Sequence, residues 1–156
     1  MRLSKTWFGA ILLASFVSPV LAQTNVGQLL DSGAVKLSAA EFRQEVVGRF
    51  LEGPGRGVTM ASASSGHEVA YLQDGAIRGS GYTTALGGIS GGGRNFLIEG
   101  TWTIDERDRI CQTIRASGVS FAPRCQYWFK QADKYFFADS DSDRSALVTV
   151  RTVKKM

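Results

Sequence analysis

The stretch that decides the fold is Phe-Leu-Ile-Glu-Gly-Thr-Trp-Thr-Ile, residues 96–104. Every second residue from Phe96 to Ile104 is apolar or glycine, and the residues between them are mostly polar. A period of two is typical of a half-buried β-strand with one face toward a core. The stretch therefore predicts a strand that carries Trp102 on its buried face.

Further short strands are predicted on both sides of this one. They are residues 58–63 and 68–72 with a turn at 64–67 between them, then 76–84, 110–114, 125–131, 135–138 and 146–153. Asp74-Gly75 is a two-residue hairpin signal ahead of residues 76–84. We expect a mainly β fold, an antiparallel meander of about eight strands that forms a closed or partly open barrel or curled sheet.

One short helix is predicted near the N-terminus, after a leader of residues 23–37 with a turn at Gly33. Ser38 and Glu41 have the spacing of a capping box, in which each side chain accepts a hydrogen bond from the backbone of the other. Apolar residues from Phe42 to Phe50 follow at helical spacing. We expect this helix to end at the Gly-Pro-Gly of residues 53–55.

Residues 1–22 have the features of a secretory signal peptide. Arg2 and Lys5 precede an apolar run at residues 7–17, and Val20-Leu21-Ala22 offers small residues at a cleavage site. An uncleaved membrane anchor is the alternative, but the run is shorter than the ~20 apolar residues that a membrane span needs. We expect residues 23–156 to form a single β-domain that is periplasmic or secreted.

Composition and charge exclude several classes of protein. Apolar residues make up 44% of the chain and charged residues 21%, which excludes a disordered chain. The formal net charge of +4 falls to +2 when Arg2 and Lys5 are removed with the signal peptide. The basic residues do not form a patch, so we expect no nucleic-acid partner.

Cys111 and Cys125 are the two cysteines of the chain. In an exported protein an even number of cysteines favours a disulfide, and two free buried thiols are the alternative. If residues 109–115 and 124–130 pair as a hairpin, the two cysteines fall opposite each other. We therefore expect a Cys111–Cys125 bridge that shares a face with Thr113 and Tyr127.

The motifs that resemble catalytic or cofactor-binding sites are incomplete. Asp139, Asp141 and Asp143 have the spacing of the first three carboxylate ligands of a calcium-binding loop. The glycine and glutamate that such a loop also requires are absent, so an acidic turn is favoured. The glycines of residues 87–93 lack the lysine of a phosphate-binding loop, and those of residues 53–57 lack a preceding strand. We expect no cofactor and no metal.

His67 is the only histidine of the chain, and Ser64, Ser65 and Glu68 lie near it in the sequence. No nucleophile-elbow motif surrounds any of the serines. We therefore interpret His67 as a histidine on a surface turn and expect no catalytic residue.

Aromatic residues are densest between Tyr127 and Phe137. A platform for single-stranded nucleic acid is one interpretation, but alternation across a sheet favours core packing with some surface aromatics. If the barrel is open, we expect Trp102, Tyr127 and Phe129 to line a cavity for a small ligand.

Several short motifs occur together along the chain. They are Leu37-Ser38-Ala39-Ala40-Glu41, Tyr71-x-x-Asp74-Gly75, Gly100-Thr101-Trp102, Ile110-Cys111, and Cys125-x-Tyr127-Trp128 followed by Tyr135. In this order the chain resembles a family of small exported proteobacterial proteins that are described only as a domain of unknown function. The resemblance supports the β fold and implies no activity, cofactor or catalytic residue.

The sequence thus favours a non-catalytic exported β-domain. We expect it to bind a small apolar ligand, an envelope component or another protein. The alternative is an inhibitor of a hydrolase that acts through a protruding loop between strands, such as residues 116–123. An enzyme ranks behind both hypotheses.

Overall fold

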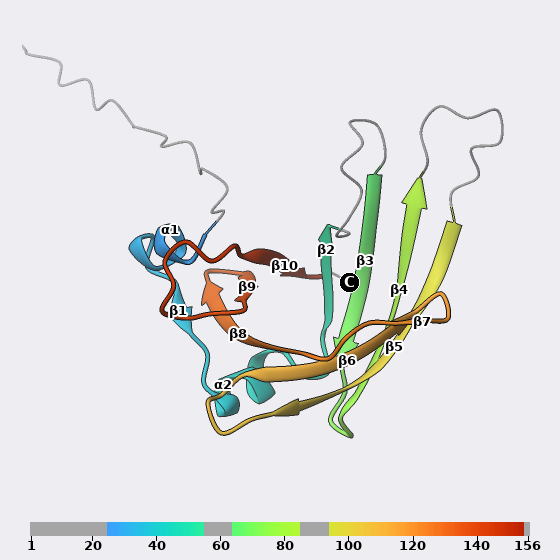
Figure 1. The fold of residues 1–156 in the computed structure, drawn as a ribbon, viewed down its shortest axis with the longest axis horizontal. Coiled ribbons are helices and arrows are strands. Elements are labelled where there is room, and N and C mark those ends of the chain that lie inside the picture. The colour runs from blue at the N-terminus through green and yellow to red at the C-terminus, as the bar shows by residue number, and fades with distance from the viewer. Residues whose placement is uncertain (1–24, 55–63, 85–93, 155–156) are drawn as a thin grey trace, which may run out of the picture.

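The computed structural model describes residues 25–54, 64–84 and 94–154 (Figure 1). Within these ranges the elements, in chain order, are α1 (Val26–Asp31), β1 (Val35–Lys36), α2 (Ala39–Glu45), β2 (Phe50–Pro54), β3 (Ser64–Tyr71), β4 (Ala76–Thr84), β5 (Arg94–Ile104), β6 (Ile110–Ala116), β7 (Val119–Ser120), β8 (Arg124–Gln131), β9 (Lys134–Ala138) and β10 (Thr149–Val153). The mainly β prediction is confirmed.

The strands form one antiparallel sheet that closes into a barrel. Its order is β1-β8-β9-β10-β2-β3-β4-β5-β6-β7, and an additional pairing of β8 with β6 closes a ring of eight strands. The short strands β1 and β7 extend the sheet beyond this ring along β8 and β6. The predicted barrel is therefore closed rather than partly open.

Strand β5 has the alternation that the sequence predicts. Ile98 and Trp102 are buried, while Leu97, Glu99 and Thr101 on the opposite face are exposed. β5 pairs with β4 on one side and with β6 on the other. The Asp74-Gly75 turn is also confirmed, because it joins β3 to β4 and Gly75 has a φ of 84°.

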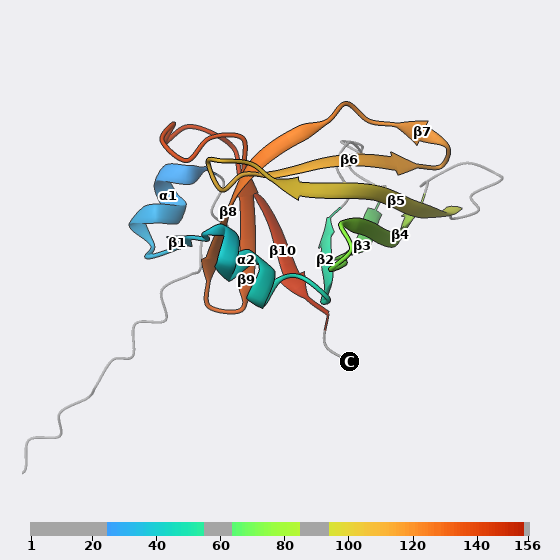
Figure 2. The same ribbon diagram turned by 90° about the horizontal axis from the view of Figure 1, so that it is seen from below.

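Helix α2 covers one end of the barrel (Figure 2). Its capping box is confirmed, since the Ser38 side chain accepts from the Glu41 backbone and the Glu41 side chain accepts from the Ser38 backbone. Phe42 enters the interior, where its ring lies 5.5 Å from Tyr71, 5.5 Å from Trp102 and 5.1 Å from Trp128 between centroids. These edge-to-face contacts fill the covered end of the barrel.

The predicted end of this helix is wrong. α2 ends at Glu45, and Gly48 then takes a φ of 84°, a left-handed conformation that commonly stops a helix. Phe50 therefore lies on strand β2 instead of on the helix, and half of its surface is exposed. β2 gains its extended form from pairing with β3 and β10, which lie far from it in the sequence.

Two further predictions are wrong, one for the leader and one for the turn at residues 64–67. The leader contains the additional helix α1, which begins at a cap from the Asn25 side chain, although the expected turn at Gly33 is present. Residues 64–67 are not a turn but the first half of β3, because they pair with β4 along its full length. The predicted strand at residues 58–63 and the predicted signal peptide at residues 1–22 lie outside the described residues.

The dense aromatic segment supplies both faces of the β8–β9 hairpin. Trp128, Tyr135 and Phe137 join the cluster inside the barrel. Phe129 and Phe136 face outward and are buried beneath Val26 and Leu29 of α1. Core packing was predicted for half of these aromatics, but α1 turns the outer face of the hairpin into a second core.

Candidate functional site

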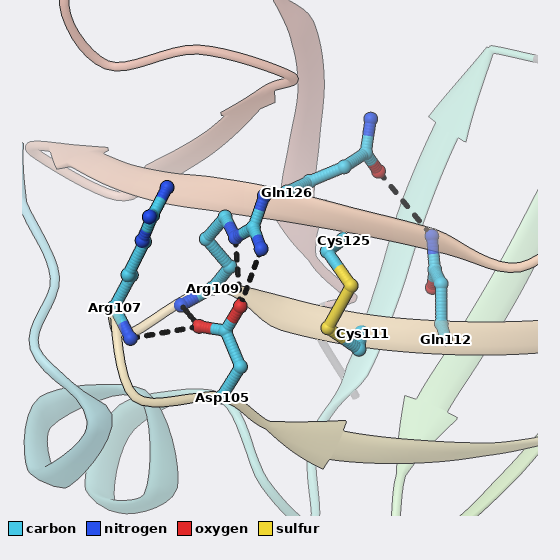
Figure 3. The surroundings of a disulfide bond; sticks show 7 residues. All are labelled: Asp105, Arg107, Arg109, Cys111, Gln112, Cys125 and Gln126. Atoms are coloured by element: carbon cyan, nitrogen blue, oxygen red, sulfur yellow. Dashed lines mark hydrogen bonds and ion pairs between the residues drawn. A yellow bond between two sulfur atoms is a disulfide. The ribbon is translucent and has the colours of Figure 1, made fainter.

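The predicted disulfide joins Cys111 to Cys125 across the seam that closes the barrel (Figure 3). The two cysteines are directly opposite in register, and their Cα atoms are 3.8 Å apart. Only the pairs Ile110–Gln126 and Gln112–Arg124 accompany them in the pairing of β6 with β8. The bridge thus reinforces a short seam, and both cysteines are half-buried, as the shared face with Thr113 and Tyr127 predicts.

Asp105 lies beside the bridge and completes a group of three potential metal ligands. Its carboxylate, Cys111 and Cys125 have ligand atoms within 4.8 Å of one another. The two sulfur atoms are bonded to each other, and Asp105 accepts hydrogen bonds from the backbone and the side chain of Arg109 (Figure 3). The sulfur atoms and the carboxylate are therefore already engaged in a covalent bond and in hydrogen bonds. This arrangement favours a structural role for the group over metal binding.

Trp102 lies inside the barrel, where it is 8% exposed. Its ring packs against Phe42 and Tyr71, and its Nε1 donates a hydrogen bond of 2.9 Å to the carbonyl of Leu72. The polar group of the indole is therefore satisfied and its faces are in contact with protein. Packing explains the position of this tryptophan.

Tyr127 and Phe129 lie on the outer face of β8, opposite to Trp128. Phe129 is buried under α1, and the ring of Tyr127 lies 5.1 Å from the Lys36 ammonium. The structure does not bring these two residues together with Trp102. The three side chains proposed for a ligand cavity belong to two different clusters on the two faces of the sheet.

The acidic segment after β9 is held by protein groups. Asp139 accepts from Arg124 and Gln126, and Asp141 accepts from Lys36 at 2.8 Å. Asp143 accepts from the backbone and hydroxyl of Ser145. These contacts fit the interpretation as an acidic turn. The glycine-rich segment of residues 87–93 lies outside the described residues.

A groove of about 780 Å³ lies on the outer face of the barrel, over β2, β3, β4 and β5 and beside β10. Its polar lining comprises Glu52, His67, Glu68, Ser80, Asn95, Thr152 and Lys154. Tyr82 and Val150 add an aromatic and an aliphatic surface. The volume is that of a typical site for a small molecule, about 300–1,000 Å³. We name this the outer groove.

The lining follows the register of the sheet. Thr152 pairs with Glu52, Glu52 with Glu68, and Glu68 with Ser80. These four residues therefore form one row that runs across β10, β2, β3 and β4, which we name the polar row. Adjacent strands lie about 4.8 Å apart, so the polar row is about 14 Å long.

A second row runs beside the first and contains an aromatic ring. Gly66 pairs with Tyr82, and Tyr82 pairs with Asn95. A Cβ atom at Gly66 would lie 2.8 Å from Cε1 and 2.9 Å from the hydroxyl oxygen of Tyr82. Because Gly66 has no side chain, the phenol of Tyr82 can lie over the neighbouring strand β3. The residue is 47% exposed.

The charges of the outer groove are unequal. Glu68 accepts hydrogen bonds from Lys154 and Ser80, and the bond from Lys154 is the main reason that the pKa of Glu68 is lowered. The same bond raises the pKa of Lys154. Glu52 lies opposite Glu68 on the neighbouring strand. Two carboxylates therefore face one ammonium group.

His67 lies between the outer groove and the barrel interior. Its Nε2 is 2.6 Å from Nη2 of Arg151, a residue that is 7% exposed and lies 4.9 Å from the ring centroid of Phe137. Burial, with a contribution from the charge of Arg151, lowers the pKa of His67 to about 4. The interpretation of His67 as a histidine on a surface turn is wrong. The residue lies in strand β3, which pairs with β2 and β4, and its ring contacts the buried Arg151.

The outer groove cannot be recognised from the sequence. The sequence predicts Glu52 in a helix and Glu68 at the start of a strand, and neither residue has a local pattern that marks a site. The available signal is weak: Ser80 lies between Gly79 and Gly81, and Gly66 lies two residues before Glu68. The polar row appears only when β10 and β2, which are about 100 residues apart in the chain, are brought side by side.

A second feature is the hairpin of β6 and β7, in which β6 continues beyond its pairing with β8 (Figure 2). Ser117 and Gly118 form its turn with φ of 52° and 81°, a left-handed pair that suits tight hairpins. Val119 is 59% exposed and Phe121 is 54% exposed. The disulfide joins β6 to β8, the strand that follows this hairpin in the chain.

Comparisons with known proteins give no relative. No family model matches the chain, and neither a curated protein nor a solved structure is significantly similar to it. Among the described residues, no helix has the length and apolar character that crossing a membrane requires.

Proposed function

We propose that this chain is an exported binding module and that its ligand, a component of the cell envelope, lies in the outer groove. Export is supported by the signal-peptide features of residues 1–22 and by the disulfide, which is compatible with an oxidising compartment. The observation that carries the proposal is the groove itself, about 780 Å³ in volume and lined largely by polar side chains.

The polar lining favours one of the three ligand classes that the sequence leaves open. A small apolar ligand would cover the Glu52 carboxylate and the Thr152 hydroxyl without offering either a hydrogen bond, which is costly. The barrel interior offers no better position for such a ligand, because Trp102 and Phe42 pack against each other there. An envelope component rich in hydrogen-bonding groups fits the lining best.

The carboxylates also favour binding over catalysis. A general acid or base works best when its pKa lies near the pH at which it acts. The pKa of Glu68 is lowered by its hydrogen bond from Lys154, which moves it away from neutral pH. Glu68 is thus suited to accept hydrogen bonds as a stable carboxylate.

The test is co-sedimentation of the mature protein, residues 23–156, with isolated envelopes. We expect the wild type to sediment with envelopes and Tyr82→Ala to remain in solution. Phe121→Ala is the matched control, since Phe121 is a similarly exposed aromatic residue away from the groove. Sedimentation of Tyr82→Ala at the wild-type level would contradict binding in the outer groove.

The alternative function is inhibition of a hydrolase by the β6–β7 hairpin. It is favoured by the exposure of Val119 and Phe121 on a hairpin whose strand β6 is crosslinked to β8. A rigid loop with an exposed aromatic residue loses little conformational entropy on binding. In this case the mature protein should reduce the muramidase, lipase or protease activity of a competitor's culture fluid, and Phe121→Ala should abolish the effect while Tyr82→Ala retains it.

A further inference from the structure

We propose that the outer groove is a saccharide site, in which a neutral or amino sugar stacks on Tyr82 and donates its hydroxyls to the polar row. This inference rests on the proposed function and names the chemical class of the envelope component. It depends on three features of the described residues, namely an exposed ring, a linear set of hydrogen-bonding groups and an excess of negative charge.

The ring is Tyr82. It lies over Gly66 on the neighbouring strand, where a Cβ would be 2.8 Å from the ring. Tyr82 lines the groove, and 47% of the residue is exposed. An aromatic ring whose one side rests on backbone offers its other side to a ligand. The C–H groups on one face of a pyranose ring are suited to that surface, because aromatic faces carry partial negative charge.

The hydrogen-bonding groups are those of the polar row. Carboxylates such as Glu52 and Glu68 accept from sugar hydroxyls, and the hydroxyls of Thr152 and Ser80 both donate and accept. The register places these side chains on successive strands, over a length of about 14 Å at a strand spacing of ~4.8 Å. A linear oligosaccharide presents hydroxyls along its length in a comparable way.

The charges exclude the main competing ligands of an envelope. Among the described residues that line the groove, Glu52 and Glu68 are the carboxylates and Lys154, which is already bonded to Glu68, supplies the one ammonium group. A phosphate-bearing lipid headgroup or a uronic acid would therefore meet an excess of negative charge. A neutral sugar avoids this repulsion, and an amino sugar gains from the carboxylate of Glu52.

The experiment separates envelopes into four fractions and measures binding of wild-type and variant protein to each. The fractions are protease-treated peptidoglycan sacculi, protease-treated lipopolysaccharide, detergent-solubilised envelope protein, and vesicles of the extracted lipids. We expect binding to at least one of the two glycan fractions and none to the lipid vesicles. The competitors are chitotetraose, its de-N-acetylated form and tetragalacturonate, and we expect the acidic tetragalacturonate to compete at least tenfold more weakly than the other two.

The variants distinguish stacking from simple apolar contact. Tyr82→Trp should retain glycan binding, while Tyr82→Leu should weaken it at least tenfold although it remains apolar. Phe121→Ala should bind as the wild type does. Circular dichroism of each variant checks that the barrel is folded, so that a loss of binding reports on the groove.

Two results would overturn the inference in different ways. Binding that depends on Tyr82 but occurs only with the protein or lipid fraction would refute a saccharide ligand and leave the proposed function intact. No Tyr82-dependent binding to any fraction would refute both. Equal glycan binding by the Trp and Leu variants would refute stacking on the ring.

Discussion

Removal of the disulfide by Cys111→Ser/Cys125→Ser tests how the barrel is held closed. The bridge spans 14 residues of sequence, and a closed loop of that size stabilises the folded state by about 3 kcal/mol in the chain-entropy model. The bridge also lies in a seam of only three residue pairs, so little else holds β6 against β8. We expect a loss of roughly 2–5 kcal/mol with the strand content retained.

Urea denaturation of mature wild-type and variant protein measures this loss. With a urea m-value of about 2 kcal/mol/M, a loss of ~3 kcal/mol moves the midpoint by about 1.5 M to lower concentration. Reduced wild-type protein is the matched control, because it loses the bridge without gaining serines. Both cysteines are half-buried, so we expect the reductant to open the bridge in the native protein.

Two results would refute this reasoning. A midpoint that moves by less than about 0.3 M would mean that the bridge contributes no more than a surface contact. Two reactive thiols in native protein purified without reductant would mean that the bridge does not form in the cell. That second result would also free Cys111, Cys125 and Asp105 as potential metal ligands.

Four further outcomes follow from the structure. Ser38→Ala should lower stability by about 1 kcal/mol through loss of the helix cap, and an unchanged urea midpoint would contradict the cap. Gly100→Ala should lower the free energy of unfolding by about 2–3 kcal/mol, because the alanine Cβ would lie 2.2 Å from the Thr113 carbonyl oxygen. A variant as stable as the wild type would refute that clash. Folding lowers the pKa of His67 from 6.5 to about 4, so the free energy of unfolding should decline as the pH falls from about 6.5 toward 4. His67→Gln should flatten that decline, as measured by urea titrations at pH 5 to 6.5. Intact mass of the exported protein should correspond to a chain that begins at Gln23, and a retained Met1 would refute cleavage.

The elements that the sequence predicted well are those that local patterns define. The alternation from Phe96 to Ile104 specifies a strand and its buried face, because successive side chains of a strand point to opposite sides. The capping box at Ser38 and the Asp74-Gly75 turn satisfy their own backbone groups within a few residues. The pairing of Cys111 with Cys125 needs only the register of one local hairpin.

The features that the sequence did not predict depend on partners far away in the chain. Phe50 and the residues after it become a strand because β3 and β10 pair with them, although their spacing suits the preceding helix. His67 lies against the buried side chain of Arg151, which is 84 residues away.

The outer groove is the clearest case of this limit. Glu52, Glu68 and Thr152 come from three separate strands, and each is an ordinary polar residue on a solvent-facing position of its own strand. A shift of one residue in any pairing would turn its side chain to the other face of the sheet. The sequence therefore determined the strands whose alternation is local, such as β5, and their buried faces. The tertiary register decided that residues 50–54 form a strand and which side chains share a site, because that register is set by packing across the whole barrel.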